Sequence, residues 1–539
     1  MTHLRRLAVA LTATTLVCPC TLLMAAETVA APVVKQQRPI KQLDLWEIAV
    51  DGNTVLDDSD IQEVLLPFLG LNKSPDDVDK AREALETFYH EQGFKTVSVT
   101  IPRQAVKEGT VLLQVLEGRV RKLSVLGSKY HSLTRIKQQA TAFAEGSVPD
   151  FTVVQKNLAT LNQQADQIVT PALKAGSMVG TIDVDLVVLD KLPLHGSFEL
   201  NNRYSQGTSE LRSSASISYD NLWQRGHSVS LFYQTAPENT SEAEVIVGSY
   251  TLRFAESPLT VALSGMRSNS NVSTLGGVEV IGGGHSYSVR ANWPLADSGE
   301  TSRSLSLGLD YKNFASKVNL GSSSILTPIR YYPVSLGYNS FTRDDNSSLQ
   351  FDTNLTVALP HLGSDSETID TNRYGARGQM IYGRSTLAYS YDLPKAFQFY
   401  AKTTAQLSDR PLISNEQLSA GGMDSVRGYL ESEAVGDYGA NGTLELRAPS
   451  LPDLFEKSLF VDHVQELRPF IFIDGASLHQ HQPLPNSSRQ VEMLSVGIGF
   501  NLNMLSRVNA VFDWSVPLVK GPSTDRGDNR LLFRLWTSF

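Results

Sequence analysis

The chain has 539 residues, which is too long for one ordinary domain, so several modules or one very large one are expected. Its formal net charge is −9 and no basic run is longer than a pair, which argues against a nucleic-acid-binding protein. Charged residues make up 19% of the chain, below the roughly 25% of typical soluble domains.

Residues 1–31 are predicted to be a secretory signal peptide. Two arginines at positions 5 and 6 precede an apolar stretch over 7–24, and small residues place the cleavage near residue 26 or 31. A retained membrane anchor is the alternative, which the small residues and Pro32 disfavour. Both cysteines, Cys18 and Cys20, lie in this segment, so the exported chain would have no disulfide. Without a later apolar run of about 18 residues, this leaves a periplasmic globular protein or an outer-membrane β-barrel.

Residues 44–119 and 120–192 are predicted to form two similar small α/β domains. In the first, strands at 44–50, 95–102 and 110–118 surround helices at 58–69 and from Ser74, where serine, proline and acids mark a helix start. The second has strands at 120–127 and 181–190, an amphipathic helix over 151–165 and a shorter helix around 131–142. We interpret these domains as an internal repeat.

Residues 193–539 are predicted to be a transmembrane β-barrel. Segments such as 304–312 and 494–503 alternate large apolar residues with Ser, Gly, Asn and Thr, and about fifteen segments have the roughly ten-residue length of outer-membrane strands. A soluble sandwich is the alternative, but it would carry more Lys and Glu on its outward face. Aromatic residues at strand ends are interpreted as interfacial girdles: Tyr311, Tyr391, Trp514 and Trp536. Since lipid tolerates no open sheet edge, the barrel is expected to close on its final strand.

Several motifs spread over the chain carry a resemblance to one family. The motifs are GNTVL (52–56), GF and V-IP-Q (93–104), V-EG-V (115–120), VTPALKAG (169–176), LHGSFELNNR (194–203), YDNLWQRG (219–226), GGMDSVRGY (421–429), FIDG (472–475) and the terminal Phe539. With these motifs the chain resembles the two-partner secretion transporters (TpsB) of the haemolysin secretion/activation and filamentous-haemagglutinin secretion type, within the superfamily that joins POTRA domains to a β-barrel.

The resemblance implies sixteen antiparallel strands, two periplasmic POTRA domains, and a loop over about 412–437 that folds back into the barrel lumen. It implies that Arg427 at the tip of this loop pairs with Asp474 on the barrel wall; without it, Arg427 could equally be a solvated loop residue. A guanidinium can make a two-pronged bond to a carboxylate, so the pair is expected to act as a reversible latch. The loop motif is Val426, Arg427, Gly428 and Tyr429, the wall motif is Phe472, Asp474 and Gly475, and the implied barrel-assembly signal is Phe533, Leu535 and Phe539.

Some members of the family have an N-terminal helix that plugs the pore. Residues 32–43 are too few for such a helix and its linker, so no plug helix is expected here and gating would depend on the inward loop. Gly428 is expected to let the loop backbone pass close to the barrel wall, with Tyr429 packed against it.

The expected function is secretion of one large partner protein, of haemolysin, adhesin or toxin type and β-helical, across the outer membrane of a Gram-negative bacterium without ATP. The POTRA domains would capture the partner, either by adding an extended segment to a strand edge or through a groove at the helix around 154–161. A monomer is expected, with lipid and the barrel assembly machinery as further partners. A barrel assembly factor and a passive porin are the alternative functions.

No enzymatic activity, cofactor or metal site is expected. His479 and His481 have no carboxylate or thiolate near them in sequence, and the glycine-rich run at 276–284 lacks the Lys-Ser/Thr of a phosphate loop. Both are interpreted as loop residues.

Overall fold

The computed structural model describes residues 43–539, apart from 107, 163, 165, 255–256, 270–271, 276–277, 282, 297–298, 321–322, 454–462 and 485–487. The predicted signal peptide and the segment to residue 42 therefore lie outside the described residues. The chain divides into two compact units, one ending at Glu117 and the other comprising Gly93–Thr96 and Gly118–Phe539. No helix within the described ranges is long and apolar enough to span a bilayer.

The first α/β domain contains a three-stranded sheet in the order β2–β5–β4, with a separate pair β1–β3. Helix α2 begins with a capping box, in which Ser74 and Asp77 satisfy each other's backbone N–H groups. The strand predicted over 44–50 is broken at Trp46, whose N–H donates instead to the Gly109 carbonyl at 2.9 Å. The elements are β1 (Leu43–Leu45), β2 (Glu47–Asp51), α1 (Asp58–Leu65), η1 (Leu66–Phe68), β3 (Gly70–Lys73), α2 (Pro75–Glu91), β4 (Val97–Thr100) and β5 (Thr110–Glu117).

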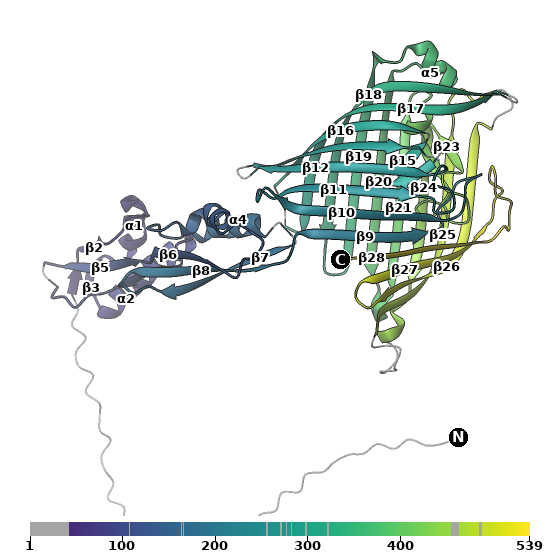
Figure 1. Ribbon diagram of the computed structural model, residues 1–539. Coiled ribbons are helices and arrows are strands. Elements are labelled where there is room, and N and C mark those ends of the chain that lie inside the picture. The colour runs from purple at the N-terminus through teal and green to yellow at the C-terminus, as the bar shows by residue number, and fades with distance from the viewer. Residues whose placement is uncertain are drawn as a thin grey trace, which may run out of the picture. The chain divides into compact units, whose positions relative to one another are not determined.

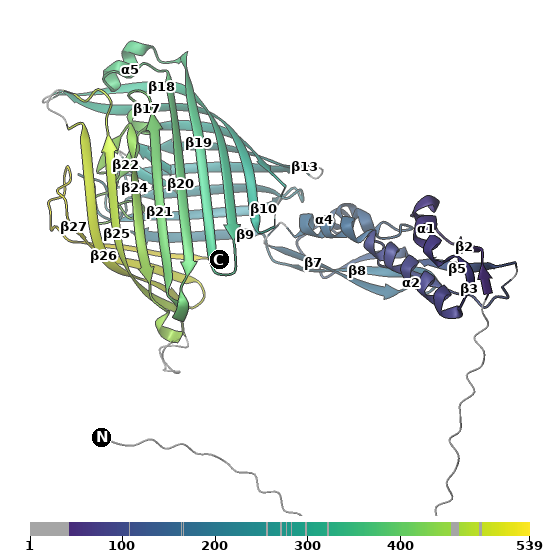
Figure 2. The same ribbon diagram turned by 180° about the vertical axis from the view of Figure 1, so that it is seen from behind.

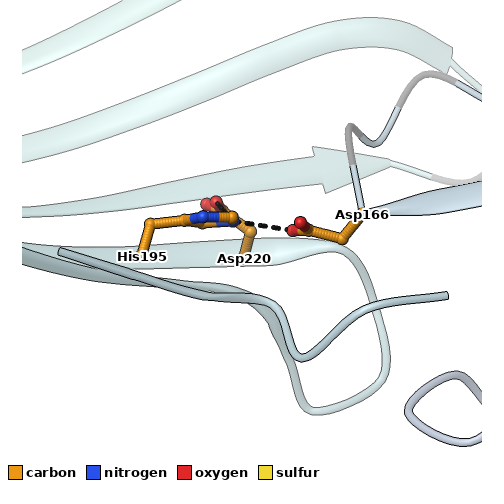
Figure 3. A group of neighbouring side chains, drawn as sticks. All are labelled: Asp166, His195 and Asp220. Atoms are coloured by element: carbon orange, nitrogen blue, oxygen red, sulfur yellow. Dashed lines mark hydrogen bonds and ion pairs between the residues drawn. The ribbon is translucent and has the colours of Figure 1, made fainter. Parts of the chain in front are cut away.

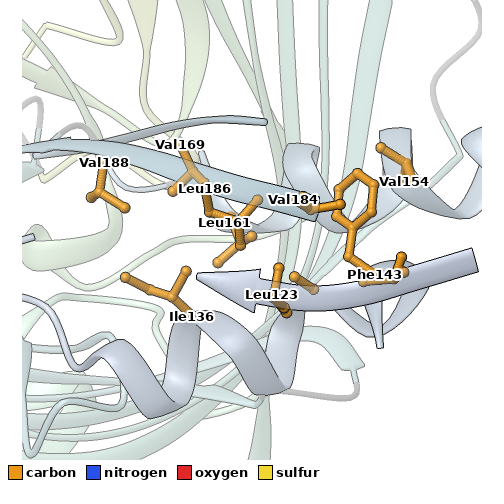
Figure 4. Close-up of a cluster of buried hydrophobic side chains, with 11 residues drawn as sticks. Leu123, Ile136, Phe143, Val154, Leu161, Val169, Val184, Leu186 and Val188 are labelled. Atoms are coloured by element: carbon orange, nitrogen blue, oxygen red, sulfur yellow. The ribbon is translucent and has the colours of Figure 1, made fainter. Parts of the chain in front are cut away.

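The second α/β domain repeats this plan with the sheet order β6–β8–β7, in which β8 is parallel to β6 and antiparallel to β7. Figure 4 shows its core, where apolar side chains of the helices meet the inner face of the sheet. Val154 and Leu161 of α4 are each 2% exposed, so this face of the helix packs on its own sheet and offers no groove. The elements are β6 (Arg119–Leu126), α3 (Leu133–Gln139), η2 (Thr141–Phe143), α4 (Phe151–Leu161), β7 (Gln167–Ala175) and β8 (Thr181–Asp190).

The remaining described residues form a closed antiparallel barrel of sixteen strands (Figures 1 and 2), which confirms the predicted fold. Each strand pairs with the next along the chain, and β28 pairs with β9. The strands are β9 (Leu194–Asn201), β10 (Arg212–Leu222), β11 (His227–Thr235), β12 (Glu244–Phe254), β13 (Ser257–Ser268), β16 (Gly283–Pro294), β17 (Thr301–Leu320), β18 (Ser323–Arg343), β19 (Ser347–Gly363), β20 (Met380–Asp392), β21 (Gln398–Ser408), β24 (Tyr438–Arg447), β25 (Val464–His479), β26 (Gln490–Met504), β27 (Val508–Pro517) and β28 (Arg530–Ser538).

Shorter elements connect these strands. They are β14 (Val272–Leu275), β15 (Val278–Ile281), α5 (Ser366–Asn372), η3 (Pro394–Ala396), η4 (Ser414–Glu416), β22 (Leu418–Ala420), β23 (Ala434–Gly436) and η5 (Leu451–Asp453).

The barrel strands alternate between an apolar outer face and a polar lumen face, as the sequence predicts. On β17, Leu305, Leu307 and Leu309 are 40–53% exposed on the outside. Small hydroxyl groups pair across neighbouring strands on the other face, as between Ser230 and Ser249 at 2.7 Å. A side-chain period of two places every second residue in lipid and the others in the lumen.

The seam between β28 and β9 closes the barrel through five residue pairs, from Arg534–Asn201 to Ser538–Ser197. Trp536 belongs to the lumen face at this seam, and its assignment to a lipid-facing girdle was wrong. Its neighbour on the same face is Arg534, whose guanidinium lies 4.6 Å from the indole centroid and pairs with Glu199. A cation over an aromatic face stabilises this position inside the lumen.

Candidate functional site: a loop inside the barrel lumen

The segment 409–437 connects β21 to β24 at the end of the barrel opposite to the start of β9. Most of its residues are buried, and its short hairpin β22–β23 lies within the barrel (Figures 1 and 2). A sixteen-stranded barrel is wide enough to leave an aqueous channel. We call this segment the lumen loop, because it lies inside the barrel.

Arg427 of the lumen loop contacts Asp474 of β25 through three hydrogen bonds. The guanidinium donates from Nε to Asp474 Oδ2 at 2.7 Å and from Nη2 to Oδ1 at 2.8 Å. The Arg427 backbone N–H donates to Oδ2 at 3.0 Å. The two side chains are only 6% and 0% exposed, so the pair is desolvated as well as bidentate. Such a pair fixes geometry, because each charge is costly to bury alone.

Two further strands contribute acids to the same site. Glu445 Oε1 lies 2.8 Å from Arg427 Nη1, and Asp513 Oδ1 lies 3.9 Å from it. Glu445 also pairs with Arg447 at 2.7 Å. The three carboxylates thus depend on two guanidinium groups, of which only Arg427 comes from the loop.

Phe472 provides an aromatic floor beneath Arg427, with the guanidinium carbon 3.4 Å from the ring centroid. Along β25 the alternation directs Phe472 and Asp474 into the lumen, while Ile473 between them is 42% exposed on the outside. A Cβ at Gly497 on β26 would overlap the Phe472 ring and the Trp514 carbonyl. The missing side chain is therefore what lets the aromatic ring lie flat under the cation.

Gly428 and Tyr429 shape the loop next to this pair. Gly428 has φ +96°, whereas an added Cβ would meet Pro517 and Ser495 only at 3.5 Å. The backbone conformation, rather than close passage along the wall, is what favours glycine here. The Tyr429 hydroxyl lies 2.7 Å from the Val519 carbonyl and accepts from the Leu494 N–H at 3.2 Å.

A second buried cluster anchors the start of the loop on the far wall. Glu416 is 3% exposed, and it accepts hydrogen bonds from Lys312 Nζ at 2.7 Å, from the Tyr331 hydroxyl at 2.7 Å and from the Tyr382 hydroxyl. These partners lie on β17, β18 and β20, several strands away from β25 in the barrel order. The loop therefore crosses the lumen between two opposed anchors.

A third contact involves Glu433, whose carboxylate accepts from the Thr524 hydroxyl at 2.6 Å and the Ser523 N–H at 2.8 Å. At the end of the loop, the fully buried Asp437 accepts from the Leu412 N–H at 2.8 Å and is paired with Arg373 at 3.2 Å. Ionic and polar contacts thus hold the loop at both ends and at its tip.

This architecture agrees with the comparisons with known proteins. A family model described as haemolysin secretion/activation protein ShlB/FhaC/HecB matches residues 180–502, which is more than half of the chain. The chain belongs to this family. A model of the ShlB-type POTRA domain matches residues 43–118.

Relatives of the family resemble most of the chain. The outer membrane transporter CdiB of Dickeya dadantii (strain 3937) is 21% identical over 86% of this chain and 81% of its own length. The heme/hemopexin transporter protein HuxB of Haemophilus influenzae (strain ATCC 51907 / DSM 11121 / KW20 / Rd) is 20% identical over 74% and 70%. The solved structure of CdiB from Escherichia coli covers 95% of this chain and 93% of that chain, with a TM-score of 0.64 and 18% identity.

Members of this ShlB-type family are outer-membrane transporters of two-partner secretion, with POTRA domains in the periplasm, and this chain is one of them. With that orientation, the lumen loop belongs to the extracellular end of the barrel, since β9 begins at the periplasmic second α/β domain. The roles of individual residues in the loop remain predictions.

The three predicted C-terminal residues lie apart from the loop site, on the outer face of β28 or just beyond it. The Phe533 ring packs near Phe512, with centroids 6.4 Å apart, and Leu535 pairs with Leu200 of β9. Phe539 is 68% exposed, and its ring covers Gly196, with which it exchanges two backbone hydrogen bonds. Phe539 thus extends the β28–β9 seam, and its role in barrel assembly stays a prediction.

Gly475 of the wall motif has neither a positive φ nor a crowded Cβ position, and nothing in the structure explains a glycine there. His479 was predicted to be a loop residue but is the last residue of β25, where strand pairing with β24 continues to the end. Its ring stacks on that of Tyr438 with centroids 5.0 Å apart, and the His481 ring lies tilted against the same ring at 4.7 Å. These histidines therefore help to pack the extracellular end of β24 and β25.

Sequence reasoning missed several residues of the site because their partners are distant in the chain. Glu416 lies 104 residues from Lys312, and the acids Glu445 and Asp513 lie on strands that carry no motif. The one available signal is the phase of the strand alternation, which places Glu445 and Asp513 on lumen faces where a carboxylate needs a partner.

Proposed function

We propose that this chain is the dedicated transporter of one large exported protein, and that the lumen loop is its gate. The observation that carries this proposal is the desolvated ion cluster around Arg427, which joins the loop tip to the barrel wall beside a small apolar cluster of Val426 and Tyr429 with Leu478 and Met493. The charged groups of this contact can be solvated by water when the loop leaves, which lowers the cost of opening. The partner would then pass through the space that the loop vacates.

We infer that the partner is first captured in the periplasm by the second POTRA domain. Four apolar side chains form an exposed patch on the sheet face opposite the helices: Leu126 (47% exposed), Ile168 (54%), Val187 (40%) and Leu189 (68%). Register pairs Ile168 with Leu189 and Leu126 with Val187, so the four lie side by side. The adjoining β7 is an edge strand of this sheet. An extended segment of the partner added to β7 would gain main-chain bonds from the edge and apolar contacts from the patch.

The partner is expected to be a β-helical haemolysin, adhesin or toxin, which folds only after it emerges outside the cell. Folding there would make transport directional without ATP, because a folded chain cannot re-enter the lumen. A partner variant that cannot fold should then be secreted poorly; unchanged secretion would exclude this source of free energy. The transporter itself acts as a monomer with no catalytic step. During biogenesis, the barrel assembly machinery recognises the Phe533–Phe539 segment.

The test of the proposed function compares the proteins in the culture medium and in the outer membrane, for the parent strain and a deletion strain. Loss of one large protein from the medium, with the outer membrane otherwise intact, would establish dedicated secretion. A joint decrease of many barrel proteins would instead show an assembly factor. The parent strain must express both the transporter and its candidate partner. If it does, and neither set of proteins differs between the two strains, the chain is a passive porin.

Capture is tested separately, by complementing the deletion with Leu189→Ser. Secretion of the partner should fall while the barrel level stays normal, because the variant removes the most exposed member of the patch. Leu71→Ser is the matched control, since Leu71 is 62% exposed on the first POTRA domain and lies outside the patch. Equal secretion by the two variants would contradict capture at the second domain.

A further inference from the structure

Three side chains of types that can bind a metal ion meet where the second POTRA domain adjoins the first barrel strands (Figure 3). Asp166 precedes β7, His195 is on β9 and Asp220 is on β10, and their ligand atoms all lie within 4.8 Å of one another. The Asp166 side chain is only 8% exposed, while those of His195 and Asp220 are 39% and 36% exposed. The cluster therefore has a buried end and an end that opens to solvent.

A single imidazole N–H cannot serve both carboxylates at once. His195 Nε2 lies 2.8 Å from Asp166 Oδ2 and 3.4 Å from Asp220 Oδ2. One imidazole nitrogen carries at most one proton, so it can donate to only one of the two carboxylates. Full protonation of the ring would add the second proton at Nδ1, on the far side, which still leaves the second carboxylate without an N–H. A cation between the three donors would satisfy each of them.

The distances are close to those of a metal site. Donors about 2.1 Å from a tetrahedral zinc ion lie about 3.4 Å from one another. The His195–Asp220 distance has this value already, and the His195–Asp166 distance has to open by about 0.6 Å, which a side-chain rotation supplies. One imidazole and two carboxylates are ligands that Zn²⁺ accepts, and the exposed side leaves room for a water as a further ligand.

We propose that Asp166, His195 and Asp220 bind a divalent transition-metal ion of the Zn²⁺ class. The ion would join a loop of the second POTRA domain to the first barrel hairpin. A neighbouring joint already connects the same two parts: Gln224, in the β10–β11 turn, accepts from the Ser132 N–H at 2.9 Å and donates to the Tyr130 carbonyl at 3.0 Å. Metal binding would add a second point of attachment, so the second POTRA domain could no longer rotate about the first point of attachment.

The experiment measures Zn²⁺ bound per chain by equilibrium dialysis, on the full-length protein in detergent, purified without a histidine tag and stripped with a chelator. His195→Gln should bind one Zn²⁺ fewer than the wild type, or bind it at least tenfold more weakly. His227→Gln is the matched control, because His227 lies on the adjoining strand β11 and its Nδ1 pairs with the Tyr250 hydroxyl at 2.7 Å. Its zinc content should equal that of the wild type.

Asp220→Asn provides a second variant at a partly exposed position, which should fold even where the histidine change does not. It should lose the same Zn²⁺ and also the visible absorption of bound Co²⁺, which reports coordination directly. Equal zinc content in the wild type, in His195→Gln and in Asp220→Asn would overturn the proposal, as would Co²⁺ spectra that the two changes leave intact.

Discussion

Replacing Arg427 by alanine should open the channel. In the wild type, the Arg427 guanidinium compensates the fully buried carboxylate of Asp474 and contacts Glu445 at 2.8 Å. The Arg427→Ala variant keeps its backbone N–H to Asp474, and Thr443 still donates its hydroxyl there, but the counter-charge is gone. With the loop out, water can solvate the same carboxylate, so the change penalises only the closed state.

The size of this effect follows from the burial of the pair. Removing one partner of a buried ion pair costs about 3–5 kcal/mol, because the remaining charge is left uncompensated. Since about 1.4 kcal/mol corresponds to a factor of ten, the equilibrium should shift towards the open state about 100-fold or more. By contrast, Arg410 pairs with Asp409 at 2.7 Å with both side chains at least 35% exposed, and an exposed pair contributes only about 0–1 kcal/mol.

The assay is the single-channel conductance of the purified protein in planar lipid bilayers. Arg427→Ala should spend far more time in the high-conductance state, while Arg410→Ala should resemble the wild type. Adding Asp474→Asn to Arg427→Ala should restore part of the closed state, because it removes the uncompensated charge. Wild-type conductance of a correctly folded Arg427→Ala barrel would refute the reasoning that this pair holds the loop.

Three further changes test other parts of the structure. Glu416→Gln should also raise the open probability, because Lys312 loses its buried counter-charge; wild-type conductance would show that the far anchor holds nothing. Gly497→Val should displace the Phe472 ring and increase cleavage of the lumen loop by external protease, whereas Gly475→Ala, with its nearest neighbour 3.6 Å away, should not; equal cleavage would contradict the aromatic floor. Burial raises the pKa of Asp190, but N–H groups of Tyr130 and Lys129 and the Ser128 hydroxyl outweigh it and lower the pKa to about 2. Asp190 therefore stabilises the second POTRA domain by about 2 kcal/mol above pH 5, and this is lost as the pH falls towards 2. The urea midpoint of that domain, read from an attached fluorophore, should fall over this range in the wild type and stay flatter in Asp190→Asn; parallel curves would refute the assignment.

The barrel was predictable from sequence because lipid and lumen impose a strict alternation on every strand. The start of helix α2 at Ser74 was predictable for a different reason, because its capping residues Ser74 and Asp77 are neighbours in sequence. It also shows why Trp536 was assigned wrongly: Phe533 and Leu535 face lipid, so the period of two places Trp536 with Arg534 in the lumen. The prediction gave more weight to an aromatic residue near a strand end than to the phase of the inward–outward alternation along the strand.

The interior of the site was only partly predictable. The pairing of Arg427 with Asp474 came from motif resemblance, and no local pattern would have joined residues 47 positions apart. Glu445 and Asp513 carry no sequence signal beyond the strand face on which they lie, and Glu416 in η4 of the lumen loop carries none. Their partners are set by how the loop crosses a closed barrel. The cluster of Asp166, His195 and Asp220 could not be predicted for the same reason, because Asp166 and His195 meet only once the second POTRA domain lies against β9.

The central claim is that the lumen loop must leave the barrel lumen before the partner can pass. A disulfide between the loop and the barrel wall tests this claim most directly. An added Cβ at Gly428 lies 3.5 Å from the Cβ of Ser495, within the separation of about 3.5–4.5 Å that a disulfide spans. The Gly428→Cys/Ser495→Cys variant should insert normally and retain its partner in the cell until a reductant is added. Gly428→Cys alone controls for strain at φ +96° and should secrete with or without reductant. Secretion at the wild-type rate with the disulfide intact would contradict the account.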